Sequence, residues 1–269
     1  MTSESVDNSG DPWALLDAEL AAWAAGTQVA TMWWRDDDAV APGQKLDKLV
    51  EMTRNTGLLL AVIPARAQEQ LASMLAVSSH VQVAQHGYAH INHAPRGQGL
   101  GAWELGLHRG MDAVLSDLQA GRDRLEALFG TLFLPVVVPP WNRIAPELLE
   151  PIAASNYLGV SAFGPCESIN APSGQASSSL IIANAHCDPI RWKSGAAFAG
   201  ESKTILQLVA HLQARRSGLV SVSEHTGFLT HHIDLDNAGW AFCSRLTALV
   251  ESHPGAQWVS PATVFGISS

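Results

Sequence analysis

Three consecutive carboxylates are the residues best suited to chemistry in this chain. Asp36, Asp37 and Asp38 follow an apolar, β-prone run that ends in Trp33 and Trp34. Adjacent acids repel one another, so the cluster costs stability unless a cation neutralises it. Successive residues leaving a strand point in different directions, which lets one carboxylate bind a metal ion while the next accepts a proton from water. An exposed acidic turn or a helix N-cap is the weaker alternative, because the two tryptophans should bury this segment.

Two histidines four residues apart offer the matching metal ligands. His86 and His90 enclose residues 87–89, and this spacing predicts both imidazoles on one side of a helical turn. Many such pairs are only surface histidines, but here a carboxylate cluster accompanies the pair. The sequence therefore predicts an Asp/His/His site for one divalent cation. Zn²⁺ is the expected ion, with Co²⁺, Ni²⁺ or Mn²⁺ as alternatives.

A rigid turn made by two prolines precedes another polar segment. Pro139 and Pro140 are followed by Trp141, Asn142 and Arg143. The N–H of Trp141 would face an oxyanion and its ring would wall a sugar pocket, with Asn142 and Arg143 as further substrate contacts. A strand terminator with a packed tryptophan explains the same residues without a function, and the sequence does not separate the two interpretations.

Two later segments add histidines, an acid and another tryptophan. Asp188 or His186 is a candidate for orienting a catalytic partner, and Trp192 for lining the cleft. The adjacent His231 and His232 end another β-prone run. Because an unperturbed imidazole titrates near ~6.5, either one could protonate a leaving amine. A core or capping histidine is the alternative.

Alternating strand and helix patterns surround these segments. Strands are predicted over residues 28–34, 58–63, 81–85, 132–138, 158–163, 180–184, 227–230 and 258–259, and helices over 12–26, 44–55, 68–77, 105–129, 146–155, 201–215 and 237–252. This order predicts a parallel sheet, closed or nearly closed into a barrel. Each polar segment follows the carboxyl end of a predicted strand, where parallel barrels assemble their active sites. Residues 164–179, rich in Gly, Ser, Pro and Asn, are either an active-site loop or a plain surface excursion.

Composition limits the class of protein. The 269 residues show no internal boundary, so we expect one domain over residues 11–269 after a disordered leader, residues 1–10, that lacks the features of a signal peptide. A formal net charge of −9 without a basic stripe argues against nucleic-acid binding. No apolar run approaches the roughly 18 residues of a membrane span. Three widely spaced cysteines, of which Cys187 is expected to be buried and unreactive, fit a reducing cytoplasm.

In whole-chain order these segments resemble the polysaccharide deacetylase family, carbohydrate esterase family four. Residues 35–39 (R-D-D-D-A) occupy the place of the family's T-F-D-D-G motif, and residues 86–90 match its H-[ST]-x-x-H motif with Gly87 at the second position. Residues 138–141 look like R-x-P-Y without the Arg, and residues 188–192 like D-x-x-D-W with Arg191 at the second Asp. Residues 228–232 resemble the final L-x-L-x-H motif.

The resemblance assigns a role to each matched residue. It implies Asp37 as the catalytic base, and Asp38 with His86 and His90 as the metal ligands. It implies His231, or else His232, as the acid. The family fold is a distorted (β/α) barrel of seven or eight parallel strands in a single domain. In the family, the third-motif Arg pairs with the fourth-motif Asp and tunes the base, but this Arg is missing here. Either Arg143 or Arg191 replaces it, or the base is tuned in a different way.

The expected activity is metal-dependent hydrolysis of an acyl group, most simply acetyl, from an N-acylated sugar or related amide. Trp141, Asn142, Arg143, Asp188 and Trp192 would contact this small carbohydrate substrate in the cytoplasm. One alternative is a catalytically silent member that binds a glycan or a metal. Another is a barrel hydrolase for a phosphoester or a cyclic amide, with Asp36 and His93 as ligands of a second metal. Oligomeric state leaves no signal in the sequence.

Overall fold

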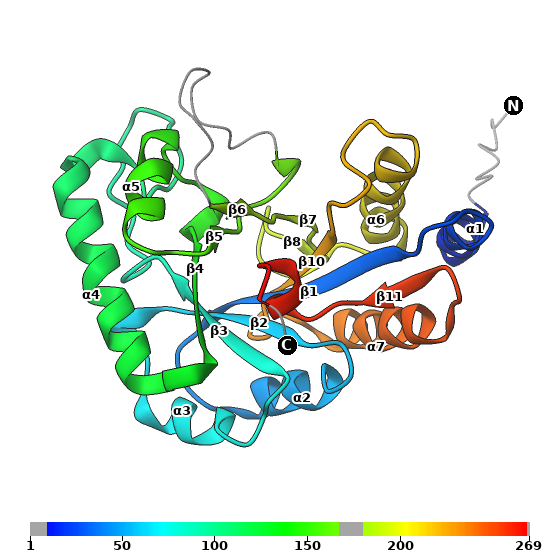
Figure 1. The fold of residues 1–269 in the computed structure, drawn as a ribbon, viewed down its shortest axis with the longest axis horizontal. Coiled ribbons are helices and arrows are strands. Elements are labelled where there is room, and N and C mark those ends of the chain that lie inside the picture. The colour runs from blue at the N-terminus through cyan, green and yellow to red at the C-terminus, as the bar shows by residue number, and fades with distance from the viewer. Residues whose placement is uncertain (1–9, 167–179, 268–269) are drawn as a thin grey trace, which may run out of the picture.

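The computed structural model describes residues 10–166 and 180–267. Its main sheet is parallel throughout, with strand order β6-β5-β4-β3-β2-β1-β10-β7 and β11 paired with the first half of β1 (Figure 1). The strands are β1 Ala30–Ala39, β2 Leu58–Val62, β3 Val81–His86, β4 Phe133–Val138, β5 Gly159–Val160, β6 Ile181–Ile182, β7 Ala185–Cys187, β10 Thr226–Thr230 and β11 Ala256–Trp258. A separate antiparallel pair consists of β8 Ile190–Arg191 and β9 Ala197–Phe198.

Hydrogen bonds close this sheet into a ring. A parallel bridge joins Phe163 to Ala185, and the Gly164 N–H donates to the Ala185 carbonyl at 2.8 Å. The segment 181–187, which contains β6 and β7, therefore pairs with β5 and its extension on one side and with β10 on the other. Seven strand positions make the ring and β11 adds an eighth strand beside β1. This confirms the predicted distorted (β/α) barrel in a single domain.

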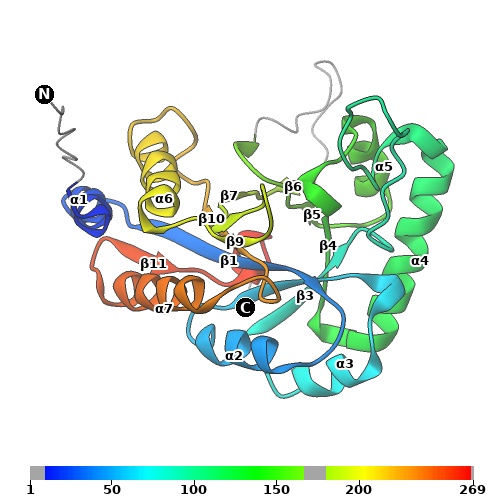
Figure 2. The same ribbon diagram turned by 180° about the vertical axis from the view of Figure 1, so that it is seen from behind.

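Helices cover the outside of the barrel. They are α1 Pro12–Ala24, α2 Gln44–Met52, α3 Glu69–Leu75, α4 Met111–Phe129, α5 Leu149–Ala154, α6 Glu201–Arg216, α7 Asn237–Ser252 and α8 Pro261–Val264. In Figures 1 and 2, α4 and α5 lie at one end of the molecule, and α1, α6 and α7 at the other. Within the described ranges, no helix combines the length and apolar character needed to cross a membrane.

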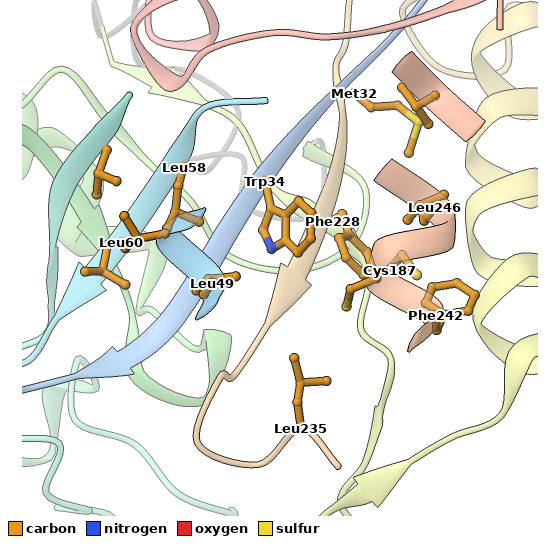
Figure 3. Packing of buried hydrophobic residues seen from close by; sticks show 14 of the residues in the cluster. Met32, Trp34, Leu49, Leu58, Leu60, Cys187, Phe228, Leu235, Phe242 and Leu246 are labelled. Atoms are coloured by element: carbon orange, nitrogen blue, oxygen red, sulfur yellow. The ribbon is translucent and has the colours of Figure 1, made fainter. Parts of the chain in front are cut away.

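Alternation along β1 separates two cores. Met32 and Trp34 point outward into the layer beneath the helices, where the Trp34 ring meets Phe228 at 5.0 Å between centroids (Figure 3). Trp33 points into the barrel, where it packs against Phe265. Because side chains alternate along a strand, the next inward positions are 35 and 37. Both are charged, and both lie toward the carboxyl end of the barrel.

Most predicted elements are present, with shifted boundaries. The first strand continues to Ala39, so Asp36 and Asp37 lie within it rather than beyond it. The long helix predicted from residue 105 begins at Met111, because Gly110 has a φ of 83° that a helix cannot continue. The predicted leader lies outside the described residues except for Gly10, as does most of the predicted loop, residues 167–179.

Candidate metal centre

A β-bulge lets two adjacent carboxylates face the same pocket. The pairing of β1 with β2 shifts register between Asp36 and Ala39, and Asp38 has a φ of 71°. In a regular strand Asp37 and Asp38 would point to opposite faces, but the extra residue of a bulge re-aims one side chain. Both acids therefore line a cavity of about 440 Å³ at the carboxyl end of the barrel.

Asp38 meets both predicted histidines. Its Oδ1 lies 3.2 Å from His86 Nε2 and 3.3 Å from His90 Nε2. His86 uses Nδ1–H to donate to the Val138 carbonyl at 3.0 Å, so its Nε2 presents a lone pair toward Asp38. Oδ1 is buried and makes no hydrogen bond of good geometry within the described part of the chain. Two imidazole nitrogens and a carboxylate oxygen that converge in this way fit a divalent cation.

The loop that carries His90 is not the predicted helical turn. Gly87 and His90 both have positive φ, 54° and 58°. The loop wraps the buried carboxylate of Glu104, which accepts the N–H groups of Tyr88 at 3.1 Å and Ala89 at 2.8 Å. A Cβ at Gly87 would come within 2.0 Å of Glu104 Oε2, so only glycine fits there. Glu104 thus positions His90, although nothing in its sequence surroundings indicates this.

Arg35 is a candidate site residue that the sequence did not reveal. It is fully buried inside the barrel, with Nε 3.0 Å from Asp37 Oδ1 and Nη2 3.1 Å from Asp37 Oδ2. Its remaining N–H groups donate to the Ser161 and Ala162 carbonyls, the Ser161 hydroxyl and Asn142 Oδ1. The guanidinium thereby neutralises Asp37 and fixes the orientation of its carboxylate. The i, i+2 spacing on one strand was the available signal.

The two adjacent histidines at the end of β10 separate. His231 lines the cavity, and its ring meets Trp192 edge-on at 4.6 Å between centroids. His232 is buried on the other side, where its Nδ1 and its backbone N–H both bond to Asp36. Asp36 also accepts the Thr230 hydroxyl at 2.6 Å. The prediction that His232 could serve as the acid is therefore wrong, since its ring is committed to holding β10 against β1.

Most of the predicted substrate contacts line the cavity, but one does not. Trp141, Asn142, Asp188 and Trp192 all line it, together with Phe163, which had not been predicted. Arg143 instead points away, donating to the Leu100 carbonyl at 3.1 Å. The predicted substrate contact from Arg143 is thus wrong. The guanidinium of Arg143 bonds to backbone carbonyls of the loop at residues 100–102, and these carbonyls hold it away from the cavity.

Strained backbone gathers at this site. Among the described residues, six non-glycine residues have positive φ, and Asp38, His90, Trp141 and Asn142 are four of them. Such conformations cost about 1–3 kcal/mol each and persist where the surrounding structure enforces them. Such a concentration of strained residues around one cavity is typical of a functional site.

Burial and neighbouring charges shift the pKa values of all three predicted metal ligands. Burial would raise the pKa of Asp38, but the neighbouring His86, His231 and His90 outweigh it and hold that pKa well below its usual range. Burial lowers the pKa of His86, yet Asp38 and Asp37 raise it overall. For His90, burial and the charge of His86 lower the pKa. Asp38 and His86 thus each favour the charged form of the other when no cation is bound.

The comparisons with known proteins concern the fold. No protein-family model matches the chain, and no curated protein matches it in sequence. A solved structure from Mycobacterium smegmatis described as a polysaccharide deacetylase matches with a TM-score of 0.64 and 13% identity, over 90% of each chain. The chain has the polysaccharide deacetylase fold. A T48 deacetylase solved with substrate gives a TM-score of 0.51 at 12% identity, covering 91% of this chain and 94% of that one. A CE4 family pseudoenzyme from Bacillus anthracis gives 0.52 at 17% identity, over 90% of this chain and 66% of that one.

Within the polysaccharide deacetylase fold, this chain places its arginine differently. The third motif of the family carries an Arg where this chain has Val138. Neither expected substitute takes its place: Arg143 points to Leu100, and Arg191 is exposed and donates to the Lys193 carbonyl. The cation that pairs with Asp37 is Arg35, on β1.

A second group of metal-type side chains in this fold has a different explanation. Cys166, His186 and Glu224 bring possible ligand atoms within 4.8 Å of one another. The Gly227 N–H, however, donates to His186 Nδ1 at 3.0 Å. Since that nitrogen accepts, a neutral His186 carries its proton on Nε2, which donates to Glu224 at 2.8 Å and has no lone pair for a metal. Burial lowers the pKa of His186 to about 4, which agrees with this neutral form. The group is a partly buried hydrogen-bond network.

Proposed function

We propose that the protein is a metal-dependent hydrolase that removes an acyl group, most simply acetyl, from an N-acylated sugar or related amide. One observation carries the proposal: Asp38, His86 and His90 converge on one point while Asp37 stands beside them, held by Arg35. A carboxylate that ligates the metal and a second carboxylate that accepts the proton of the attacking water suit metal-dependent amide hydrolysis. The deacetylase fold of the structural neighbours supports the same activity.

The residues would divide the reaction as follows. A divalent cation held by the three ligands, Zn²⁺ by preference, supplies Lewis-acid activation of water and of the amide carbonyl. Asp37 accepts the proton from the attacking water, and Arg35 keeps its carboxylate aimed at that water. The Trp141 N–H, on a left-handed turn with φ 55°, donates to the developing oxyanion. His231 donates the proton that the departing amine requires, so that the C–N bond breaks without releasing an amide anion.

Two variants distinguish the role of a metal ligand from the role of the catalytic base. The native protein and the variant Asp37→Asn should each bind one divalent ion per chain, and the variant should lose at least about 10³-fold in turnover. The variant His90→Ala should lose the ion. Acetate release from a panel of N-acetylated sugars and the metal content per chain are the two measurements. Full activity of Asp37→Asn, or an unchanged metal content of His90→Ala, contradicts the proposed roles.

A catalytically silent protein that binds a glycan is the second candidate. The third and fourth motifs depart from the family pattern, and one structural neighbour is described as a pseudoenzyme. Acetate release with added Zn²⁺ or Co²⁺ distinguishes the two. The third alternative, a phosphoester hydrolase, would need Asp36 and His93 as ligands of a second metal. Neither residue is available, because the Asp36 oxygens bond to Thr230 and His232 and because His93 does not line the cavity. We still expect the protein to act in the cytoplasm, on a small substrate.

A further inference from the structure

Asn142 brings the only carboxamide to the part of the cavity lining that the structure describes. It follows Trp141 in the turn after β4, and its side chain is half-buried. The other polar side chains of the lining are three carboxylates and three imidazoles, besides the two tryptophan rings. A carboxamide does not titrate, and it offers N–H donors on one side and an acceptor oxygen on the other. The direction of this amide therefore decides what it can offer to a ligand.

Arg35 fixes that direction. Its Nη2 donates to Asn142 Oδ1 at 2.5 Å. A guanidinium carries donors only, so the amide must present its oxygen to Arg35 and turn its nitrogen the other way. Nδ2 makes no hydrogen bond to the described residues, and it is not among their buried polar atoms that lack a partner. Nδ2 is therefore the polar atom that Asn142 offers to a ligand in the cavity.

The same guanidinium nitrogen places this amide beside the base. Arg35 Nη2 also donates to Asp37 Oδ2 at 3.1 Å. The Asn142 amide and the Asp37 carboxylate thus share one donor nitrogen, and both side chains line the cavity. The amide therefore reaches the part of the cavity that the Asp37 carboxylate faces.

The backbone of the turn supplies a second free donor. Trp141 and Asn142 both have left-handed φ values, 55° and 57°. Within the described ranges, the Asn142 N–H donates to the Pro139 carbonyl at 2.9 Å, but no backbone carbonyl accepts the Trp141 N–H. A backbone N–H and a nearby asparagine amide are the kind of donors that form oxyanion holes.

The conformation of the turn does not by itself call for an amide. Asparagine tolerates a φ of 57° better than most residues do, but glycine adopts it without steric cost. Only a side chain of this kind can accept from Arg35 and keep an N–H for the cavity.

We propose that Asn142 is a further catalytic residue, whose Nδ2–H donates to the acyl oxygen that gains negative charge, beside the Trp141 N–H. This role rests on the proposed hydrolysis of an acyl group. Because Arg35 holds the amide before a substrate arrives, the donor needs no reorientation during the reaction, and donors fixed in advance stabilise developing charge best. Arg35 thereby orients both the base and a donor to the oxyanion.

Two variants distinguish a donor from a residue that only contacts Arg35. Asn142→Asp keeps the size of the side chain and an oxygen for Arg35, but it removes the N–H groups. Asn142→Gly removes both and suits the left-handed turn. Loss of one oxyanion donor lowers kcat by about 10²–10³-fold, so both zinc-loaded variants should lose at least about 10²-fold in kcat, with KM changed by less than about threefold. An Asn142→Asp variant with native kcat would show that the amide only holds Arg35, and would overturn the proposal.

Asn156 provides the matched control. It is an exposed asparagine with a φ of 61°, and it does not line the cavity. Asn156→Asp and Asn156→Gly should both keep kcat within about twofold of the native value. Zinc content per chain is measured on all four variants. Loss of the ion from Asn142→Asp would overturn the proposal, since Asn142 would then act through the metal site.

A binding measurement on the native chain does not depend on turnover. Acetate, the simplest acyl product, is titrated into the zinc-loaded, ¹⁵N-labelled chain, and the Asn142 side-chain amide signal is identified by its absence in Asn142→Asp. A hydrogen bond to acetate should move one Nδ2 proton signal downfield, while the Asn156 amide signal stays in place. An Asn142 signal that does not move at the highest acetate concentration overturns the proposal. If the signal moves and no N-acetylated sugar is hydrolysed, the proposed function fails and Asn142 remains a donor to an acyl oxygen.

Discussion

Replacement of Arg35 by methionine tests the electrostatic design of the site most directly. The substitution keeps much of the side-chain volume but leaves the Asp37 carboxylate buried without its counter-ion. Breaking a buried ion pair by removing one partner costs about 3–5 kcal/mol. The Ser161 and Ala162 carbonyls and the Asn142 amide oxygen would also lose donors, at about 1–3 kcal/mol for each acceptor left unpaired.

We therefore expect Arg35→Met to lower the free energy of unfolding by at least about 3 kcal/mol, measured by urea denaturation. The double variant Arg35→Met/Asp37→Asn removes both charges and should recover about 2 kcal/mol of that loss. Metal content should survive in both, because neither residue ligates, whereas turnover should be lost in both. Arg143→Met is the matched control, since this exposed arginine makes only carbonyl contacts at the surface, and should change stability by less than about 1 kcal/mol.

The cycle can refute the reasoning in two ways. A loss below about 1 kcal/mol for Arg35→Met would mean that the ion pair contributes little beyond packing. The loss of unfolding free energy in the double variant could also equal the sum of the losses in Arg35→Met and Asp37→Asn. Such additivity would mean that Arg35 and Asp37 are not coupled. In either case another residue would have to neutralise the base.

Three further predictions follow from the same geometry. Asp36→Ala leaves the His232 ring and the backbone N–H without their acceptor, and should cost about 2–4 kcal/mol of unfolding free energy while metal content is unchanged; a loss below about 1 kcal/mol would contradict the contact. Because the pKa of His186 is about 4 in the folded protein and near ~6.5 unfolded, the contribution of His186 to stability should be complete above pH 6.5 and should shrink by about 3 kcal/mol as pH drops to 4. His186→Gln should flatten that dependence in urea titrations at pH 7, 5.5 and 4, and Gln in place of the exposed His108 should not. The raised pKa of His86 predicts that metal binding releases a proton and weakens as pH falls, which calorimetry in buffers of different ionisation enthalpy detects.

Elements with a local cause were predictable from the sequence. Helix α1 begins where Asp11 and Pro12 predict, and the Asp11 side chain accepts the Trp13 N–H at 3.0 Å. The buried strand β2 lies within the apolar run at 58–63, and β4 ends before Pro139-Pro140. Apolar runs, caps and prolines act through neighbours in the chain, so their signal survives without tertiary information.

Features of the site that depend on the direction of a side chain could not be predicted from the sequence. The sequence could not choose between His231 and His232, because adjacent residues at a strand end face opposite sides and only packing decides which side is the interior. Nor could it show that the loop after His86 is wound around Glu104. These contacts join residues far apart in the chain or turn on backbone conformations that no local pattern specifies.

The sequence by itself determined which chemical groups meet at one rim of a barrel: parallel strands end on the same edge, so polar residues at their carboxyl ends converge whatever the details of packing. Only the tertiary structure decided how those groups divide their work. A bulge turned Asp38 toward the histidines beside Asp37, closure of the barrel brought Ser161 across to Arg35, and the arginine became the counter-ion of the base. The direction and pairing of a charged side chain depend on register and burial, which exist only once the strands have assembled.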